Sequence, residues 1–93
     1  MTGAEQIAAE RQRQLSEEGW TSEHDAAWVN GELVSAAICY ARTAVDGYAG
    51  RMSAPLGWPW HEDWWKPSNY LRNLVRAGAL IAAEIARLEA ALE

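Results

Sequence analysis

Residues 71–92 read LRNLVRAGALIAAEIARLEAAL, and this stretch decides the fold. Apolar or small residues recur in it at alternating steps of three and four, which is the spacing of a helix seam sustained over three heptads. The seam consists of Leu71, Leu74, Gly78, Ile81, Ile85, Leu88 and Leu92. Val75 and Ala82 widen it into a core-facing stripe, and residues 77–83 are apolar on nearly every side. The pattern predicts a helix over about residues 68–92 with residues 77–83 at the centre of the packing.

A helix of that length would reach beyond its neighbours. About 25 residues at 1.5 Å each span roughly 37 Å, longer than either helix expected before it. The overhang ends in leucines, which need apolar cover, and a second copy of the chain could supply that cover. We therefore expect a homo-oligomer, a dimer or higher. The alternative is that the seam packs within one subunit.

The first shorter helix is expected at the start of the chain. Thr2 and Glu5 have the spacing of a capping box, which begins a helix over about residues 3–18. Gly19 is placed to end this helix in a left-handed conformation. Apolar residues at helical spacing predict the face that packs on the rest of the bundle: Ala4, Ile7, Ala8 and Leu15. The charged residues are expected on the other faces: Glu10, Arg11, Arg13 and Glu17.

Apolar spacing predicts another helix over about residues 31–45. Residues 21–28 carry several helix-capping side chains, and they leave open whether a short helical turn forms there. The fold class is therefore all-α. We expect a small three-helix bundle, about 3–18, 31–45 and 68–92, in one domain that spans residues 1–93.

The long connection between the second and third helices, residues 46–67, holds the most unusual segment of the chain. Its part 58–67 reads WPWHEDWWKP and contains four of the six tryptophans, while the chain has no phenylalanine. The two prolines exclude a continuous helix through this segment. An indole ring buries a large apolar area and keeps one N–H donor, so it suits both a lid over the bundle and a platform for a planar ligand. The sequence leaves both interpretations open.

Composition limits the partners. The formal net charge of −5 argues against non-specific nucleic-acid binding, which needs a basic surface, so no DNA partner is expected. The same charge argues against an anionic membrane surface, and no apolar tract approaches the ~20 residues of a membrane span. The lone Cys39 cannot form an internal disulfide. We expect a cytoplasmic protein.

The candidate ligand site combines cations with aromatic rings. Arg72 and Arg76 are one helical turn apart, and Lys66 stands at the start of the same predicted helix. Guanidinium groups and helix N-termini attract phosphate and carboxylate groups, so with the indoles they predict a nucleotide-like pocket. The alternative is that these cations pair with acids of the same chain. The candidate ligand-binding residues are Trp20, His24, Asp25, Trp58, Trp60, Trp64, Trp65, Lys66, Arg72 and Arg76.

Catalytic chemistry has weaker support. Glu23, His24 and Asp25 cluster near Glu32 and could ligate a metal or act as acid and base, but acids at a helix entry also serve as caps. Cys39 lies in an apolar helical pattern, which predicts inert core, and no Gly-x-Ser-x-Gly motif occurs. No catalytic residue, metal ligand or cofactor is therefore assigned.

Longer motifs of the chain resemble a widespread group of small phage and prophage proteins. They are ERQRQ (10–14), EGWT (18–21), EHD (23–25), GEL (31–33), WPW (58–60), WWKP (64–67), LVRAGALI (74–81) and AEI (83–85). The likeness extends over nearly the whole chain and implies phage origin without a mechanism. Members commonly have His-Asp-Asp-x-His where this chain has His24-Asp25-Ala26-Ala27-Trp28. The missing acid and imidazole weaken a metal or hydrolase function, and the added tryptophan favours a binding surface.

Three functions follow as hypotheses. The expected one is a non-enzymatic phage or prophage accessory protein, such as a counter-defence factor, whose tryptophan loop holds a nucleotide-like small molecule or a host protein. The second is an enzyme similar to the MazG-type metal-dependent nucleotide pyrophosphohydrolases, with Glu17, Glu18, Glu32 and Glu84 converging on magnesium. That family's Glu-x-x-Glu and Glu-x-x-Asp pairs are not intact here. The third is a purely structural oligomeric module.

Overall fold

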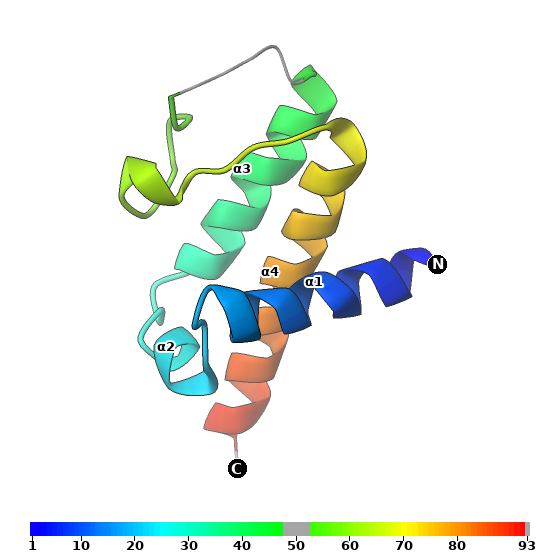
Figure 1. Cartoon of the computed structure of the whole chain (residues 1–93). Coiled ribbons are helices and arrows are strands. Elements are labelled where there is room, and N and C mark those ends of the chain that lie inside the picture. The colour runs from blue at the N-terminus through cyan, green and yellow to red at the C-terminus, as the bar shows by residue number, and fades with distance from the viewer. Residues whose placement is uncertain (48–52, 93) are drawn as a thin grey trace.

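The computed structural model describes residues 1–47 and 53–92, and its regular elements are all helices (Figure 1). In chain order these are α1 (Gly3–Glu17), α2 (Ser22–Ala26), α3 (Glu32–Asp46), the 3-10 helix η1 (Glu62–Trp64) and α4 (Tyr70–Ala91). Helices α1, α3 and α4 form the three-helix bundle that the sequence predicts, and the tryptophan-rich segment joins α3 to α4. The sequence left open whether residues 21–28 form a short helical turn, and α2 shows that they do. Neither described range contains a strand.

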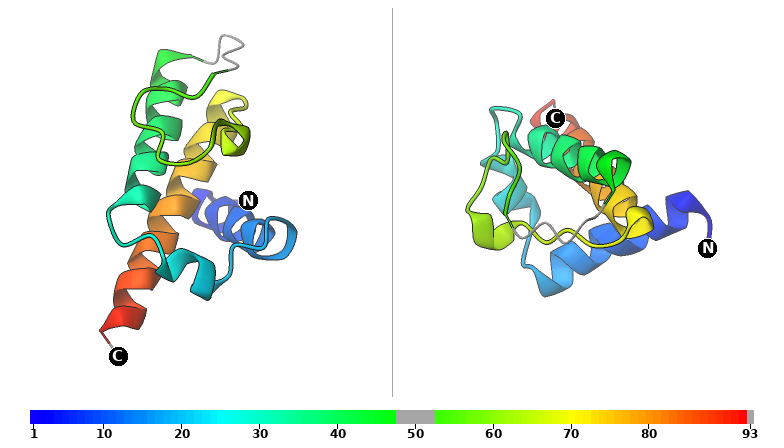
Figure 2. Two further views of the ribbon diagram at one scale, coloured as in Figure 1. Left: turned by 90° about the vertical axis from the view of Figure 1, so that its left-hand side faces the viewer. Right: turned by 90° about the horizontal axis from the view of Figure 1, so that it is seen from above.

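The core lies between α3 and α4, which run antiparallel beside each other (Figure 2). Small side chains let the two helices approach closely, and Leu33 and Leu80 fill the space that remains, each at most 1% exposed. The prediction that residues 77–83 lie at the centre of the packing is borne out at four of them. The small buried residues of the pair are Ala36, Ala37, Ala77, Ala79 and Ala83.

The start of α4 differs by two residues from the prediction. The side chain of Asn69 accepts a hydrogen bond from the backbone N–H of Arg72 at 2.9 Å and caps the helix. Ser68 is bonded outside the helix, because its N–H donates to Oδ1 of Asn73 at 2.8 Å and its carbonyl accepts from Nδ2 of Asn73 at 2.9 Å. Since Asn73 is fully buried, this reciprocal pair fixes where the helix begins.

Helix α1 crosses α4 and begins and ends as its sequence predicts (Figure 1). The hydroxyl of Thr2 accepts from the N–H of Glu5 at 3.1 Å, and the carboxylate of Glu5 accepts from the N–H of Thr2 at 2.8 Å. After the helix, Gly19 has a φ of 72°. This left-handed conformation, which glycine adopts without steric cost, turns the chain toward α2.

The predicted buried face of α1 is right only in part. Ile7 and Leu15 are partly buried, whereas Ala4 and Ala8 are exposed, and the most buried residues are Glu10 and Gln14, each only 2% exposed. Helical spacing alone could not reveal this, because the burial of Glu10 depends on Arg72, 62 residues further along the chain, as well as on the neighbouring Arg13. The buried side of α1 therefore carries charge into the interior.

Helix α1 touches α4 at Gly78. A methyl group built on Gly78 would lie 2.5 Å from Cδ1 and 2.9 Å from Cγ1 of Ile7, both shorter than real carbon contacts. The missing side chain at this position therefore makes room for Ile7.

The rest of the seam in α4 faces solvent, so of the two arrangements that the sequence left open, packing within one subunit is not observed. The predicted core-facing stripe is borne out at Val75, which is 4% exposed. The buried side of α4 is formed by Asn73, Val75, Ala77, Ala79, Leu80 and Ala83. We call the exposed apolar surface of α3 and α4 the open face. Its members are between 38% and 71% exposed: Val34, Ile38, Val45, Leu71, Leu74, Ile81, Ile85 and Leu88. Among the described residues, no helix has the length and apolar character needed to cross a membrane.

Candidate functional site: a charged cleft walled by tryptophans

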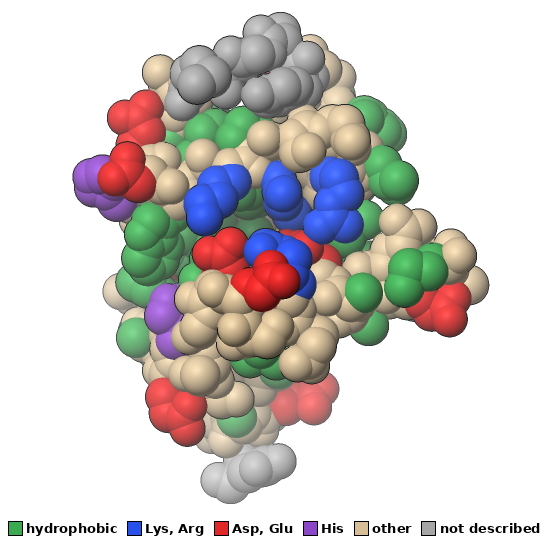
Figure 3. Space-filling view, viewed as in Figure 1, with side chains coloured by type: hydrophobic (Ala, Val, Ile, Leu, Met, Phe, Trp, Pro, Cys, Tyr) green, Lys and Arg blue, Asp and Glu red, His purple; other side chains and the backbone are tan. Residues whose placement is uncertain are grey.

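A cleft of about 430 Å³ opens between α1, α3, α4 and the segment around η1. Figure 3 shows it as a hollow with basic side chains along one rim, acidic side chains beneath them and apolar surface inside. Its volume lies within the ~300–1,000 Å³ range of small-molecule pockets. The cleft is lined by Glu10, Arg13, Gln14, Glu18, Trp20, Tyr40, Trp64, Lys66, Arg76 and Leu80.

All six tryptophans join one aromatic array beside this cleft. Trp20 and Trp28, which precede α3, meet the loop tryptophans through Trp60, with ring centroids 5.9 and 5.4 Å apart respectively. At its other end the array reaches Tyr40 of α3, whose ring centroid is 4.7 Å from that of Trp65. These separations are typical of stacked and edge-to-face aromatic pairs. The loop is thus packed against both halves of the chain.

Within the array the tryptophans divide into a lid and a wall. Trp65 is 5% exposed and belongs to the core, and Trp58 and Trp60 are partly buried against that core. Trp20 and Trp64 line the cleft; Trp20 is also partly buried against the core, whereas Trp64 is 38% exposed. The same array therefore contains core-covering rings, as a lid requires, and cleft-lining rings, as a ligand platform requires.

Most of these rings are held by packing alone. The indole N–H of Trp58 donates to the carbonyl of His61 at 3.1 Å. Those of Trp28, Trp60 and Trp65 are buried without an acceptor among the described residues. Because a buried donor without a partner costs free energy, the apolar contacts of these rings must outweigh that cost.

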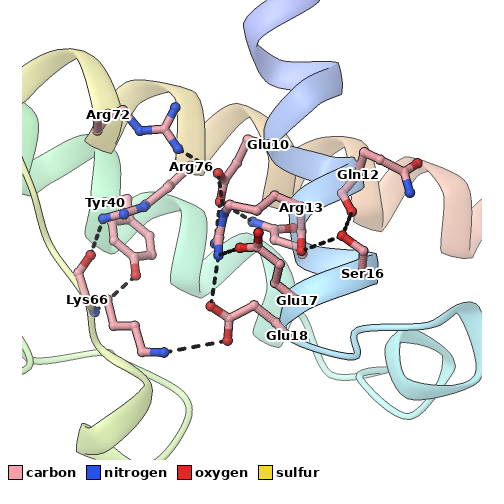
Figure 4. Close-up of polar contacts among 11 residues, drawn as sticks. Glu10, Gln12, Arg13, Ser16, Glu17, Glu18, Tyr40, Lys66, Arg72 and Arg76 are labelled. Carbon is pink, nitrogen blue, oxygen red and sulfur yellow. Dashed lines mark hydrogen bonds and ion pairs between the residues drawn. The ribbon is translucent and has the colours of Figure 1, made fainter.

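Glu10 is the centre of a buried ion cluster at the floor of the cleft (Figure 4). Its carboxylate accepts two hydrogen bonds from Arg13, both at 2.9 Å, and one from Arg72 at 2.6 Å. The side-chain amide of Gln14 donates a further hydrogen bond at 3.2 Å. The cluster thereby ties α1 to α4 through charged hydrogen bonds, in addition to the contact of Ile7 with Gly78.

The charges in this cluster hold one another in the ionised state. Burial alone would raise the pKa of Glu10, but the hydrogen bonds and positive charges of Arg13 and Arg72 outweigh it and hold that pKa below its usual range. In turn the hydrogen bond to Glu10 raises the pKa of Arg13. Glu10 is therefore neutralised by its own partners and leaves other cations of the cleft available.

Two cations on the rim are left with little or no carboxylate contact. Lys66 is 59% exposed and meets Glu18 only at 3.5 Å. Arg76 donates to the backbone carbonyl of Lys66 and makes no ion pair among the described residues. Both stand beside the rings of Trp20 and Trp64 in the lining of the cleft. This corner of the site thus has unneutralised positive charge next to an aromatic wall.

The hydroxyl of Tyr40 lies at the same corner. It accepts a hydrogen bond from the backbone N–H of Lys66 at 3.2 Å, which fastens the loop to α3. Burial raises the pKa of Tyr40, although the charge of Arg76 acts in the opposite direction. The phenol therefore stays protonated and can still donate a hydrogen bond to a ligand.

The predicted site residues His24 and Asp25 lie outside the lining of the cleft. The imidazole of His24 stacks on Trp20, with centroids 5.8 Å apart and planes within 3°, and so supports the wall from behind. Asp25 is 2% exposed and pairs with Arg11, which joins α2 to α1. Arg72 stands next to the cleft but is bound to Glu10. Of the ten candidate residues, the lining contains Trp20, Trp64, Lys66 and Arg76.

The carboxylates that a pyrophosphohydrolase would need are dispersed. Glu18 is engaged with Arg13 and Lys66, Glu84 accepts from Arg87 at 2.6 Å, and Glu32 accepts from the N–H of Asn30 at 2.7 Å. Nowhere in residues 1–47 and 53–92 do three or more His, Cys, Asp or Glu side chains lie close enough together to hold one metal ion.

Six of the ten lining residues were not predicted from the sequence as site residues: Tyr40, Leu80 and four residues from α1 and its C-terminal cap. Glu10, Arg13, Gln14 and Glu18 are spaced along one side of α1, yet that side is charged and therefore appears as a solvated face. One usable signal was the i, i+3 and i, i+4 placement of an acid, a base and an amide, which predicts local pairing on a helix. It does not predict burial.

Comparison of this chain with protein-family models, with curated proteins and with solved structures finds no match.

Proposed function

We propose that this chain is a non-enzymatic binding protein of phage or prophage origin, and that its cleft holds an anionic small molecule with a planar ring, such as a nucleotide. One observation carries the proposal. Arg76 has no carboxylate partner among the described residues, and it stands with the exposed Lys66 beside two tryptophan rings inside a cleft of about 430 Å³. The resemblance to small phage proteins supports the proposed origin, and with it a place in the host cytoplasm, but it carries no mechanism.

The charges and rings of the cleft have separate parts in this proposal. Arg76 and Lys66 would bind the phosphate groups, since charge-assisted hydrogen bonds to phosphate are the strong ones. Trp64 and Trp20 would stack on the planar ring, which is a contact worth ~1–3 kcal/mol per base at aromatic platforms. The protonated phenol of Tyr40 would donate to an acceptor on the ligand. A cleft of this depth fits a small molecule better than a host protein, which would need a broad surface.

The side chains that could act as nucleophiles favour binding over catalysis. Burial raises the pKa of the Cys39 thiol, so the thiolate is disfavoured, and the phenol of Tyr40 is likewise held protonated. No observation favours the pyrophosphohydrolase alternative, because its four glutamates do not converge: Glu17 and Glu18 share Arg13, while Glu32 and Glu84 are bound elsewhere. The purely structural alternative is addressed by the same experiment.

The test is a titration of the intrinsic tryptophan fluorescence with mono-, di- and cyclic nucleotides, with adenosine and inorganic phosphate as the ring-only and anion-only probes. We expect a response to the nucleotides, and weaker responses to either half alone. The substitution K66Q should weaken binding about tenfold, which equals ~1.4 kcal/mol. R76Q should weaken binding more, by about 1.5–3 kcal/mol. Arg76 has no carboxylate partner among the described residues, so its whole charge is available to the ligand, whereas Lys66 shares its charge with Glu18.

The matched control is R42Q. Arg42 is 73% exposed, lies outside the cleft and pairs with Asp46 at 3.8 Å, so the same change of charge should leave affinity unaltered. Because Arg76 also holds the backbone of Lys66, the thermal unfolding of R76Q is measured beside its affinity. A flat response to every probe, or equal losses in R42Q and K66Q, contradicts the proposal. Magnesium-dependent release of phosphate from nucleoside triphosphates would support the enzyme instead.

A further inference from the structure

The open face lies on the opposite side of the α3–α4 pair from the cleft. In α4, Leu74 precedes Arg76 by two residues, which turns the two side chains about 200° apart around the helix axis. In α3, Ile38 and Tyr40 have the same separation. Since Arg76 and Tyr40 both line the cleft, Leu74 and Ile38 point away from it. The two exposed stripes thus belong to a single surface on the far side of the molecule.

This surface has the pattern of a helix-packing seam. In α4 its members are spaced by three, four and seven residues, with Gly78 inside the step of seven, and in α3 Val34, Ile38 and Val45 are spaced by four and seven. Such stripes pack as knobs into holes against stripes of the same kind. Charged residues flank the stripes, Arg42 four residues after Ile38 and Glu89 four residues after Ile85. Large apolar patches of this sort on soluble chains mark sites of contact with another molecule.

We infer that the open face is a two-fold interface with a second copy of this chain, which makes a four-helix bundle from α3 and α4 of each copy. An antiparallel helix pair with apolar stripes on the same side can meet its own copy in the isologous manner of a two-fold dimer. The size of the face approaches what such a dimer needs. Helix α4 is about 33 Å and α3 about 22 Å long, and each helix is about 10 Å wide, so the face covers on the order of 550 Å² in projection. Standard interfaces begin at about 600 Å² on each partner.

The seam of α4 is thereby shared between two contacts. Gly78 receives Ile7 of the same chain, where the absence of a side chain admits α1. The large apolar residues before and after Gly78 stay free for the partner. In this arrangement the two clefts face away from each other on the outside of the dimer, so their occupancy is independent of assembly.

The test is the mass of the full chain in solution, measured by light scattering during size-exclusion chromatography. We expect twice the 10.3 kDa of one chain. The substitution I38E should return the mass to that of one chain and raise the dissociation constant at least 100-fold, because it places a charge in the middle of the apolar surface. I85E, on the other helix of the same face, should do the same.

The matched control is L56E. Leu56 is fully exposed and lies in the connection to η1, outside the open face, so the same substitution should leave the dimer intact. Circular dichroism verifies that each variant keeps its helices, which is expected since Ile38 and Ile85 are themselves exposed. A mass of one chain at about 100 μM, where even a weak dimer with a micromolar constant assembles, overturns the inference. So does a dimer that neither I38E nor I85E dissociates.

Discussion

The two sides of the α3–α4 pair differ in the kind of side chain that they carry. On the cleft side, Glu10, Arg13 and Arg72 are gathered beneath a layer of aromatic rings. On the open face, eight valine, leucine and isoleucine side chains meet solvent. An isolated globular chain gains most from the reverse arrangement, with charges outside and large aliphatic residues inside. This difference is the common basis of the two proposals, a charged ligand in the cleft and a second apolar surface on the open face.

The largest effect on stability is expected from W65A. Trp65 is 5% exposed and contacts both Tyr40 and Trp58, so truncating it leaves a cavity and should cost about 3–5 kcal/mol. Urea unfolding monitored by circular dichroism measures the loss. W64A should cost much less, since Trp64 is 38% exposed, and should weaken nucleotide binding instead. If W64A destabilises the chain as much as W65A does, Trp64 serves mainly to cover the core, which would support the purely structural function.

The second effect concerns the buried charge. E10Q removes the one carboxylate that Arg72 pairs with among the described residues and should cost about 1–2 kcal/mol. The cost stays below that of breaking a fully buried pair, because both arginines are about a third exposed and Arg13 keeps its contacts with Glu17 and Glu18. The matched control is E17Q on the same helix. Glu17 is 67% exposed and meets Arg13 only at 3.4 Å, so we expect a change within about 0.5 kcal/mol. Equal losses in the two variants would mean that the cluster around Glu10 contributes no more than a surface pair.

Local patterns predicted the parts of the fold that depend on neighbours in sequence. The capping box of Thr2 and Glu5 placed the start of α1, and the three-four spacing of α4 predicted a helix of nearly the observed length. The same spacing could not tell which side of α4 packs on α3. The buried side of α4 is rich in alanine, because two helices approach closely only where their side chains are small. The predicted seam consists mainly of large leucine and isoleucine residues, and its spacing does not distinguish burial from exposure.

The candidate site was half predictable for a related reason. Lys66, Arg76 and the loop tryptophans are close together in sequence or on one helix, so their proximity followed from spacing alone. Glu10 and Trp28 reach the site through contacts across the chain, with Arg72 and Trp60 respectively. A single sequence holds no signal for such pairs, because a charged residue on a helix has the same local pattern whether it faces solvent or a buried arginine.

A third test uses pH and isolates the contribution of Glu10. The folded-state pKa of Glu10 lies below its ordinary value of 4.5, so its ionised form stabilises the fold. That stabilisation is complete above the ordinary value and is lost as the pH falls through the lowered one. The difference in unfolding free energy between the natural chain and E10Q should therefore shrink below about pH 4.5. Glu5 and Glu84 also have lowered pKa values, but they are present in both proteins and cancel. A difference that is constant from pH 7 to pH 3 would contradict the assignment.

The smallest effect on unfolding free energy is expected at Gly78, where α4 contacts Ile7 of α1. G78A should gain about 1 kcal/mol of helix propensity but lose about 1–3 kcal/mol to the clash with Ile7, for a small net destabilisation. In an I7A background the clash is absent, so the same G78A substitution should be stabilising by about 1 kcal/mol. The change of sign, measured by urea unfolding of the four proteins, identifies Ile7 as the reason for the glycine. If G78A instead destabilises both backgrounds equally, some contact other than Ile7 requires the glycine. The seam of α4 is then not divided between Gly78, which contacts Ile7 of the same chain, and large residues that contact a second copy.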